Sequence, residues 1–281
     1  LWSLPTVRLL AARHKTPVDF MTSPKYGSIL DLIQPQTYIL KTRTNEKWDV
    51  QETAPMTPRV PPARDDNDYN ADNACVDYEA IYHLGYQKWP SRPLAEEIRV
   101  ETLGGGQPGD PQYVSLDTPW INMPDATTRT SPGPVVAVGF TNEHIELKMG
   151  VLCGLVASLP EISWRLVVPD GRAAHRAWEW ERFTRAWPEN FTFWQTSWVQ
   201  AAHVIATADL FFGCLSAPWV LANAVGTPTV IMEPSPERHN PIFWRESPKN
   251  HLVVGNDGKP TFDLRHTCDM IAAVLEEVEN A

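Results

Sequence analysis

The sequence predicts an α/β protein built from two doubly wound domains. Strand-like and helix-like segments alternate over residues 1–41, and they alternate again from residue 135 onward. This order is typical of a parallel sheet with crossover helices. A long polar stretch from residue 42 to about 74 interrupts the pattern. With 281 residues, 43% of them hydrophobic and 21% charged, the chain has the length of one large globular domain or two of ordinary size.

The first series begins with a helical pattern in residues 1–17, where Leu4, Val7, Leu10 and Ala11 recur at three- and four-residue spacing. Residues 18–23 are expected to form a strand, residues 24–34 a helix and residues 37–41 a second strand. In a parallel sheet the opening helix follows a strand, so a first strand is expected just before Leu1.

The region from residue 42 to 134 is less regular. The polar stretch 42–74 predicts a functional or mobile loop, and residues 76–87 predict a helix. Residues 96–134 mix short strands with turns. Their three glycines, 104–106, lack the Lys and Ser or Thr of a phosphate-binding loop and predict a plain loop.

The second series restarts after Pro134. Strands are expected at 135–140, 164–169, 191–195, 210–213 and 227–232. Helices are expected at 143–159, 172–187, 198–208, 217–225 and 263–280. Such a run of βα units is doubly wound. We therefore expect two domains, 1–130 and 131–281, joined near residues 126–134 with a cleft between them.

Composition excludes several classes of partner. The net charge of -10 disfavours nucleic acid and stable binding to an anionic membrane, because both need clustered Lys and Arg. No apolar run reaches the length of a membrane span and no signal peptide is visible, so we expect a cytoplasmic protein. The four cysteines are far apart without CxxC spacing, which predicts reduced, partly buried thiols and no zinc. No metal motif and no Ser-His-Asp or Cys-His pattern is present.

Residues 208–230 hold the most informative motif, "ADLFFGCLSAPWVLANAVGTPTV". An apolar strand stops at Gly213, a corner of small residues follows, and a helix starts near Ala217. Two interpretations are open. Ser216 could simply cap the helix, or Ser216 and the N–H groups from Ala217 onward could hold an anion at the helix start.

This motif resembles glycosyltransferase family 9, the heptosyltransferases that act on lipopolysaccharide cores. The opening segment 1–30 and residues 76–90 are also similar to the family. The motif positions that match without gaps are Ala208, Asp209, Leu210, Gly213, Ser216, Leu221, Ala222, Ala224, Gly226, Pro228 and Thr229, and Pro234-Ser235 echoes the family's ending. Two positions depart from it, since Leu215 and Val220 stand where the family has Asp and His.

The resemblance implies a GT-B-like architecture, in which two Rossmann-like domains face a cleft and the carboxy-terminal one binds a nucleotide sugar. It also implies metal-independent, inverting transfer with no cofactor besides that co-substrate. The family's catalytic base would fall before Leu1, so no catalytic residue is assigned. The donor-binding candidates are Thr141, Asn142, Lys148, Thr196, Ser197, Trp198, Ser216, Ala217, Pro218 and Arg238.

The sequence thus predicts a glycosyltransferase of the hexosyl or heptosyl type that uses a nucleotide-sugar donor and a saccharide or glycolipid acceptor. Such an enzyme would work in the cytoplasm or peripherally at the inner face of the membrane. The alternative is a non-catalytic nucleotide-sugar or carbohydrate-binding protein on the same fold, which the Leu215 and Val220 positions favour. A nucleotide-sugar epimerase is a third interpretation, which would need carboxylates in the cleft.

Overall fold

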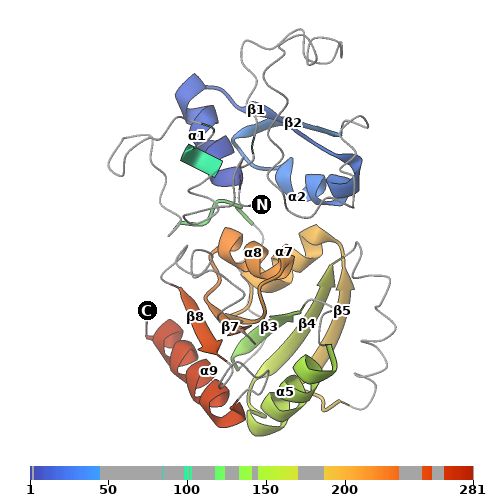
Figure 1. Ribbon diagram of the computed structural model, residues 1–281, viewed down its shortest axis with the longest axis vertical. Helices are drawn as coiled ribbons and strands as arrows, with labels where there is room; N and C mark the ends of the chain where they lie inside the picture. The colour runs from blue at the N-terminus through green and yellow to red at the C-terminus, as the bar shows by residue number, and fades with distance from the viewer. Residues whose placement is uncertain are drawn as a thin grey trace.

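The computed structural model describes residues 1, 3–44, 84, 98–100, 102, 118–123, 133–140, 145–169, 187–233, 249–254 and 263–280 (Figure 1). The polar stretch from 45 to 74, Cys75 and the glycines 104–106 lie outside these residues. The helices expected at 76–87 and 172–187 also lie outside them, apart from Leu84 and Trp187. The expected domain boundary at 130 falls outside the described residues and stays a prediction.

A six-stranded parallel sheet forms the carboxy-terminal part of the fold, with the order β5-β4-β3-β6-β7-β8. Its strands are β3 (Val135–Gly139), β4 (Ser163–Pro169), β5 (Phe191–Thr196), β6 (Leu210–Gly213), β7 (Thr229–Glu233) and β8 (Asn250–Val254). The chain starts in the middle of the sheet, runs to one edge, returns and continues to the other edge. This order confirms the doubly wound prediction.

Helices cover both faces of this sheet. On one face α5 (Ile145–Ser158) and α9 (Leu264–Glu279) pack against alternate strand residues such as Val138, Leu166 and Phe212. On the other face lie α7 (Trp198–Ala206) and α8 (Ala217–Val225), over Ala137 and Phe211. The central strands β3 and β6 are continuous apolar runs because each is buried on both faces, whereas the edge strand β5 exposes several of its residues.

The amino-terminal part contains α1 (Leu4–His14), β1 (Val18–Thr22), the 3₁₀ helix η1 (Pro24–Ile29), α2 (Leu30–Ile33) and β2 (Ile39–Thr44). Strands β1 and β2 pair in parallel. The helix expected at 24–34 is a 3₁₀ helix up to Ile29 and an α-helix from Leu30 to Ile33. The strand expected at 37–41 begins two residues later and extends to Thr44.

One apolar cluster joins this part to the sheet. It combines Leu4 and Val7 of α1 and Ile33 of α2 with Ala201 of α7 and Leu221 of α8. In Figure 1, α7 and α8 lie between the amino-terminal elements and the six-stranded sheet. The second face of α7 and α8 is thus buried by the first 44 residues, which explains why both helices are apolar on most sides.

A short segment, residues 118–123, is bonded to both parts, and we call it the strap. The backbone N–H groups of Trp120 and Ile121 both donate to the carbonyl of Ala224 at the end of α8, at 2.9 Å. From the other side, Arg8 Nη1 donates to the carbonyl of Pro119 at 3.1 Å, and the Tyr38 hydroxyl donates to the carbonyl of Trp120.

Gln36 completes the attachment of the strap. Its side chain is buried, its Oε1 accepts from the backbone N–H of Asn122 at 2.8 Å, and its Nε2 donates to the carbonyl of Leu32 at 3.1 Å. The strap is therefore held from the amino-terminal side by the side chain of Arg8 in α1 and by those of Gln36 and Tyr38, which lie just before β2.

Two local expectations were wrong. Strand β8 was not expected, because its apolar run is only three residues long and is flanked by polar residues. Pairing with β7 and a hydrogen bond of 2.6 Å from Thr229 Oγ1 to Asn250 Oδ1 fix it as a strand. Residues 98–100 and 102 are helical rather than part of a strand-and-turn mixture, since Ile98 packs into the shared apolar cluster. Tertiary packing overrides the strand preference of Ile and Val there.

Replacement of Gln36 by Ala tests the importance of the strap. The Gln36 side chain is buried, and its loss leaves the carbonyl of Leu32 and the N–H of Asn122 without their side-chain partner, so we expect the free energy of unfolding to fall by about 1–3 kcal/mol in urea denaturation. Gln34→Ala is the matched control. Gln34 also makes hydrogen bonds, to Leu40 and Thr42, but it is exposed, so a loss below about 1 kcal/mol is expected. Equal losses would show that the hydrogen bonds of Gln36 contribute no more to the free energy of unfolding than the exposed ones of Gln34.

Candidate functional site

The carboxyl edge of the six-stranded sheet contains its topological switch point. Strands β3 and β6 are neighbours at the centre, and the chain leaves them toward opposite sides. In open α/β sheets, the crevice at the carboxyl end of such a strand pair is where ligands bind. The two strands end at Gly139 and Gly213, which are partners in the register.

These two glycines allow an unusually close approach at the switch point. A Cβ on Gly139 would lie 2.7 Å from Cβ of Pro218, at the start of α8. A Cβ on Gly213 would collide with the carbonyl oxygen of Gly139. The N–H of Cys214 donates to that same carbonyl at 3.4 Å, so the corner continues directly from the strand pair. Any larger residue would push the start of α8 away from the sheet.

Helix α8 begins at this corner without a side-chain cap. Ser216 occupies the N-cap position in an extended conformation, but its hydroxyl accepts no hydrogen bond from the helix. The Ser216 Oγ atom is buried and has no hydrogen-bond partner within the described residues. Pro218 follows in the first turn and has no N–H to offer. The Ser216 hydroxyl and the N–H of Ala217 are two donors that this corner could offer to an anion, and Pro218 removes one of the N–H groups that a helix start usually provides.

The start of α7 is built differently, although a serine precedes it too. Ser197 Oγ accepts from the N–H of Gln200 at 3.2 Å, and the N–H of Ser197 donates to Gln200 Oε1 at 3.0 Å. This is a complete capping box. Ser197 thus has a structural role at this position, and a ligand could use only its hydroxyl proton.

The neighbours of Ser197 are less accessible than the sequence suggested. The side chain of Thr196 is buried, and its Oγ1 has no partner. Trp198 packs partly buried against the shared apolar cluster. Both positions are nevertheless at the carboxyl edge. With roughly 4.8 Å between neighbouring strands, the ends of β5 and β6 are about 14 Å apart, a span suited to an elongated ligand.

Of the four remaining donor-binding candidates, only Lys148 lies within the described residues. Lys148 lies in the first turn of α5, which begins at the same edge of the sheet after β3. Thr141, Asn142 and Arg238 lie outside the described residues, so their roles stay predictions.

The two departures from the family motif pack as apolar residues. Leu215 and Val220 are partly buried against the shared apolar cluster. Gly139, in contrast, is a residue of this corner that was not singled out from the sequence. A glycine at the end of a fully apolar strand, directly before the first helix, is the signal that could have identified it.

Thiols and metal clusters add nothing to this site. Within the described ranges no group of three or more His, Cys, Asp and Glu side chains is arranged to hold a metal ion. No disulfide joins the three cysteines of the described residues: Cys214 is buried, Cys268 is half-buried, and Cys153 is exposed rather than partly buried as expected. Partial desolvation by neighbouring groups raises the pKa of the Cys268 thiol and, although its side chain is exposed, that of the Cys153 thiol, which makes both poor nucleophiles near neutral pH.

Comparison with known proteins shows the fold. No protein-family model matches the chain, and no curated protein matches in sequence. Among solved structures, the Escherichia coli ADP-heptose lipopolysaccharide heptosyltransferase II is 14% identical, with a TM-score of 0.60 over 100% of this chain and 96% of that one. The glycosyltransferase family 9 structure from Veillonella parvula is 10% identical, with a TM-score of 0.63 over 98% and 93%. The fold is GT-B-like.

A third similar structure is E. coli heptosyltransferase WaaC with ADP, which is 12% identical and has a TM-score of 0.58 over 98% of this chain and 94% of that one. The likeness in each case extends over nearly the whole of both chains, so it includes the amino-terminal elements as well as the six-stranded sheet. No helix in the described part of the chain is long and apolar enough to cross a membrane.

Substitution of alanine at Gly139 tests the close approach at the switch point. The new Cβ would overlap Pro218, whose ring cannot rotate away, so we expect a loss of about 1–3 kcal/mol in the free energy of unfolding. Gly150→Ala in α5 is the control. A Cβ there meets nothing within 4 Å, and the change should stabilise the protein by about 0.5–1 kcal/mol. An unchanged melting curve for Gly139→Ala would disprove the tight contact.

The two serines before α7 and α8 should respond differently to removal of their hydroxyl groups. Ser197→Ala breaks the capping box, and thermal denaturation should show a loss of about 1 kcal/mol. Ser216→Ala breaks no hydrogen bond in the protein and should stay within about 0.5 kcal/mol of the parent. A similar loss for both would mean that Ser216 caps α8 after all.

Proposed function

We propose that this chain is a glycosyltransferase that moves a sugar from a nucleotide-sugar donor to a saccharide or glycolipid acceptor. The observation that carries the proposal is the corner at the switch point, where a buried, unpartnered serine hydroxyl lies at the start of α8 beside two strand-ending glycines. The GT-B-like fold of the whole chain supports it.

In this proposal the corner stabilises the leaving diphosphate. The Ser216 hydroxyl and the Ala217 N–H donate to phosphate oxygens, and the positive end of the α8 dipole faces the charge that develops when the glycosidic bond breaks. Backbone and hydroxyl donors can stabilise this charge without a metal ion, and we propose metal-independent transfer with inversion because the resemblance to family 9 implies both. The proposal includes no cofactor besides the nucleotide sugar.

The other candidates extend this site in two directions. Lys148, with Thr141, Asn142 and Arg238, would add donors and positive charge around the diphosphate. Trp198 and the end of β5 would lie near the nucleoside, about 14 Å across the sheet edge. The residue that takes the proton from the acceptor hydroxyl is not assigned. We propose that such an enzyme acts in the cytoplasm, or at the inner face of the membrane if its acceptor is a glycolipid.

A non-catalytic nucleotide-sugar or carbohydrate-binding protein is the second candidate. The apolar packing of Leu215 and Val220, where family 9 has Asp and His, favours it, because these positions offer no charge to a donor sugar. Both candidates bind the donor, and only the enzyme releases the nucleoside diphosphate from it.

Calorimetric titration with ADP-, UDP-, GDP- and CMP-linked sugars tests the donor site. We expect one of the four to bind, and the ADP-linked sugar is tested first because two of the similar structures are described with ADP or ADP-heptose. Absence of binding for all four at millimolar concentration would overturn the proposal. Release of nucleoside diphosphate with an acceptor mixture then separates the enzyme from the binding protein.

Ser216→Ala measures the contribution of the corner. Loss of a hydrogen bond to a charged phosphate should weaken donor binding between about tenfold and a hundredfold, with stability unchanged. Thr207→Ala is the control, since Thr207 follows α7 at the opposite, amino edge of the same sheet and its hydroxyl bonds only to the carbonyls of His203 and Val204. Equal donor affinity of the two variants would show that the diphosphate does not bind at the start of α8.

A further inference from the structure

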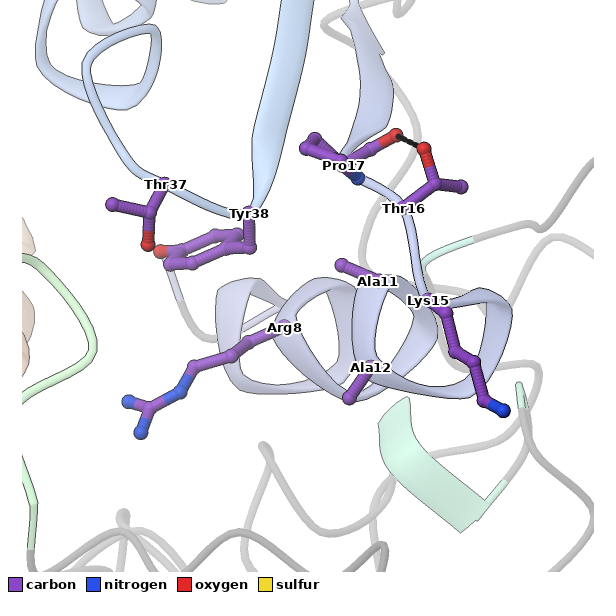
Figure 2. A pocket seen from close by; sticks show the side chains of 8 residues that line it. All are labelled: Arg8, Ala11, Ala12, Lys15, Thr16, Pro17, Thr37 and Tyr38. Atoms are coloured by element: carbon purple, nitrogen blue, oxygen red, sulfur yellow. Dashed lines mark hydrogen bonds between the residues drawn. The ribbon is translucent and has the colours of Figure 1, made fainter.

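A hollow of about 320 Å³ opens on the amino-terminal part, away from the site described above (Figure 2). Its floor is one face of α1, where Arg8, Ala11, Ala12 and Lys15 follow at the spacing of helical neighbours. Its walls are the residues that lead into β1 and β2, among them Thr16 and Tyr38. The hollow therefore lies at the amino edge of the β1-β2 sheet, whereas the proposed donor site lies at the carboxyl edge of the six-stranded sheet.

The positive charges of the hollow have few partners among the described residues. Arg8 and Lys15 are the charged residues of the described part of the chain that line it, and no carboxylate of that part does. Within the described ranges Lys15 makes no ion pair or side-chain hydrogen bond, and Arg8 uses one donor, Nη1, on the carbonyl of Pro119. Two cations with no acidic partner in the described part of the chain stand out where the net charge of the whole sequence is -10.

The backbone at Lys15 supports a role for its side chain. Lys15 ends α1 in the left-handed conformation, with φ 55° and ψ 32°, and it is the only residue other than glycine with positive φ in the described part of the chain. Glycine is the favoured residue at such a helix end. A lysine here keeps the charge beside the hollow at the expense of an unfavourable backbone conformation.

The spacing of the two cations indicates how a ligand would lie. Arg8 and Lys15 extend from opposite ends of the helix face, with the short side chains of Ala11 and Ala12 between them (Figure 2). Seven residues of helix separate their Cα atoms by about 10 Å. The Thr16 hydroxyl makes only a long hydrogen bond of 3.4 Å, to the carbonyl of Pro17, and can turn to a ligand.

We propose that this hollow binds a phosphate monoester, either on a small phosphorylated molecule or on a lipid headgroup. The charged ends of Arg8 and Lys15 diverge in Figure 2, so in this proposal both side chains turn toward Ala11 and Ala12 to neutralise the phosphate. A guanidinium fork and an ammonium are the side chains that recognise phosphate oxygens. Ala11 and Ala12 leave room for the uncharged part of the ligand. The site is independent of the proposed glycosyl transfer, and it would be occupied whether or not the chain is an enzyme.

Binding of glycerol 3-phosphate, measured by calorimetry on the whole chain, tests the proposal. We expect saturable binding that Lys15→Gly weakens by about fivefold or more. Lys15→Gly also removes the unfavourable backbone conformation, so its melting temperature should not fall. The control is Arg13→Gln, which removes one exposed positive charge from the last turn of the same helix outside the hollow, and it should keep affinity within about twofold.

Two outcomes overturn the proposal. One is the absence of saturable binding, and the other is equal weakening by Lys15→Gly and Arg13→Gln, which would show a diffuse charge effect. Binding that Ser216→Ala abolishes and Lys15→Gly leaves intact would also overturn it, because the phosphate would then lie at the start of α8. Loss of nucleotide-sugar binding in Ser216→Ala alone concerns only the proposed function.

Sedimentation with phosphatidylcholine vesicles that contain phosphatidic acid distinguishes the two sources of the phosphate. Cosedimentation that Lys15→Gly reduces and Arg13→Gln does not would assign the hollow to a lipid headgroup. Binding of glycerol 3-phosphate without cosedimentation would assign it to a soluble phosphate monoester. If neither probe binds in a manner that depends on Lys15, the hollow has no role in phosphate recognition.

Discussion

The contact between Gly139 and Gly213 is the constraint on which the carboxy-terminal part depends. Two strands that end side by side on glycine let the chain turn into α8 within three residues and press Pro218 against the strand end. The helix start then lies over the switch point of the sheet, and Ser216 is carried into a buried position without a partner. The packing of α8 beneath the amino-terminal helices follows from that position, and so does the shared apolar cluster. A close backbone approach thus fixes both the proposed ligand corner and the joining of the two parts.

The starts of α7 and α8 at the carboxyl edge have similar sequences but different hydrogen bonds. Ser197 and Ser216 each follow a buried strand and precede an apolar helix. Gln200 stands three residues after Ser197 and completes a reciprocal pair of hydrogen bonds, whereas Trp219 stands at the same distance from Ser216 and cannot. The Ser197 hydroxyl is used by the fold, whereas the Ser216 hydroxyl has no hydrogen-bond partner among the described residues. This difference makes the start of α8 a stronger candidate for anion binding than the start of α7.

Much of the fold could be predicted from the sequence where local signals mark both ends of an element. Helix α8 was predicted to the residue, because Pro218 marks its first turn and Gly226, with φ 86°, marks its end. Strand β8 was missed because its identity comes from the neighbouring β7 and from Thr229, not from its own short apolar run. In the candidate site, the sequence predicted that Ser197 and Ser216 each lie between the end of a strand and the start of a helix. The burial of Thr196 and the tight contact at Gly139 were not, since both depend on how distant segments meet.

The strap has a consequence for how the chain can be divided. Its backbone donates twice to the end of α8, while Arg8, Gln36 and Tyr38 hold it from the amino-terminal side. An expressed fragment that begins at residue 131 would lack these six residues and leave the carbonyl of Ala224 without either of its strap donors. It would also uncover the apolar faces of α7 and α8, which the first 44 residues bury. The six-stranded sheet is therefore a folding partner of the amino-terminal part, and a soluble isolated half would need polar substitutions on both helices.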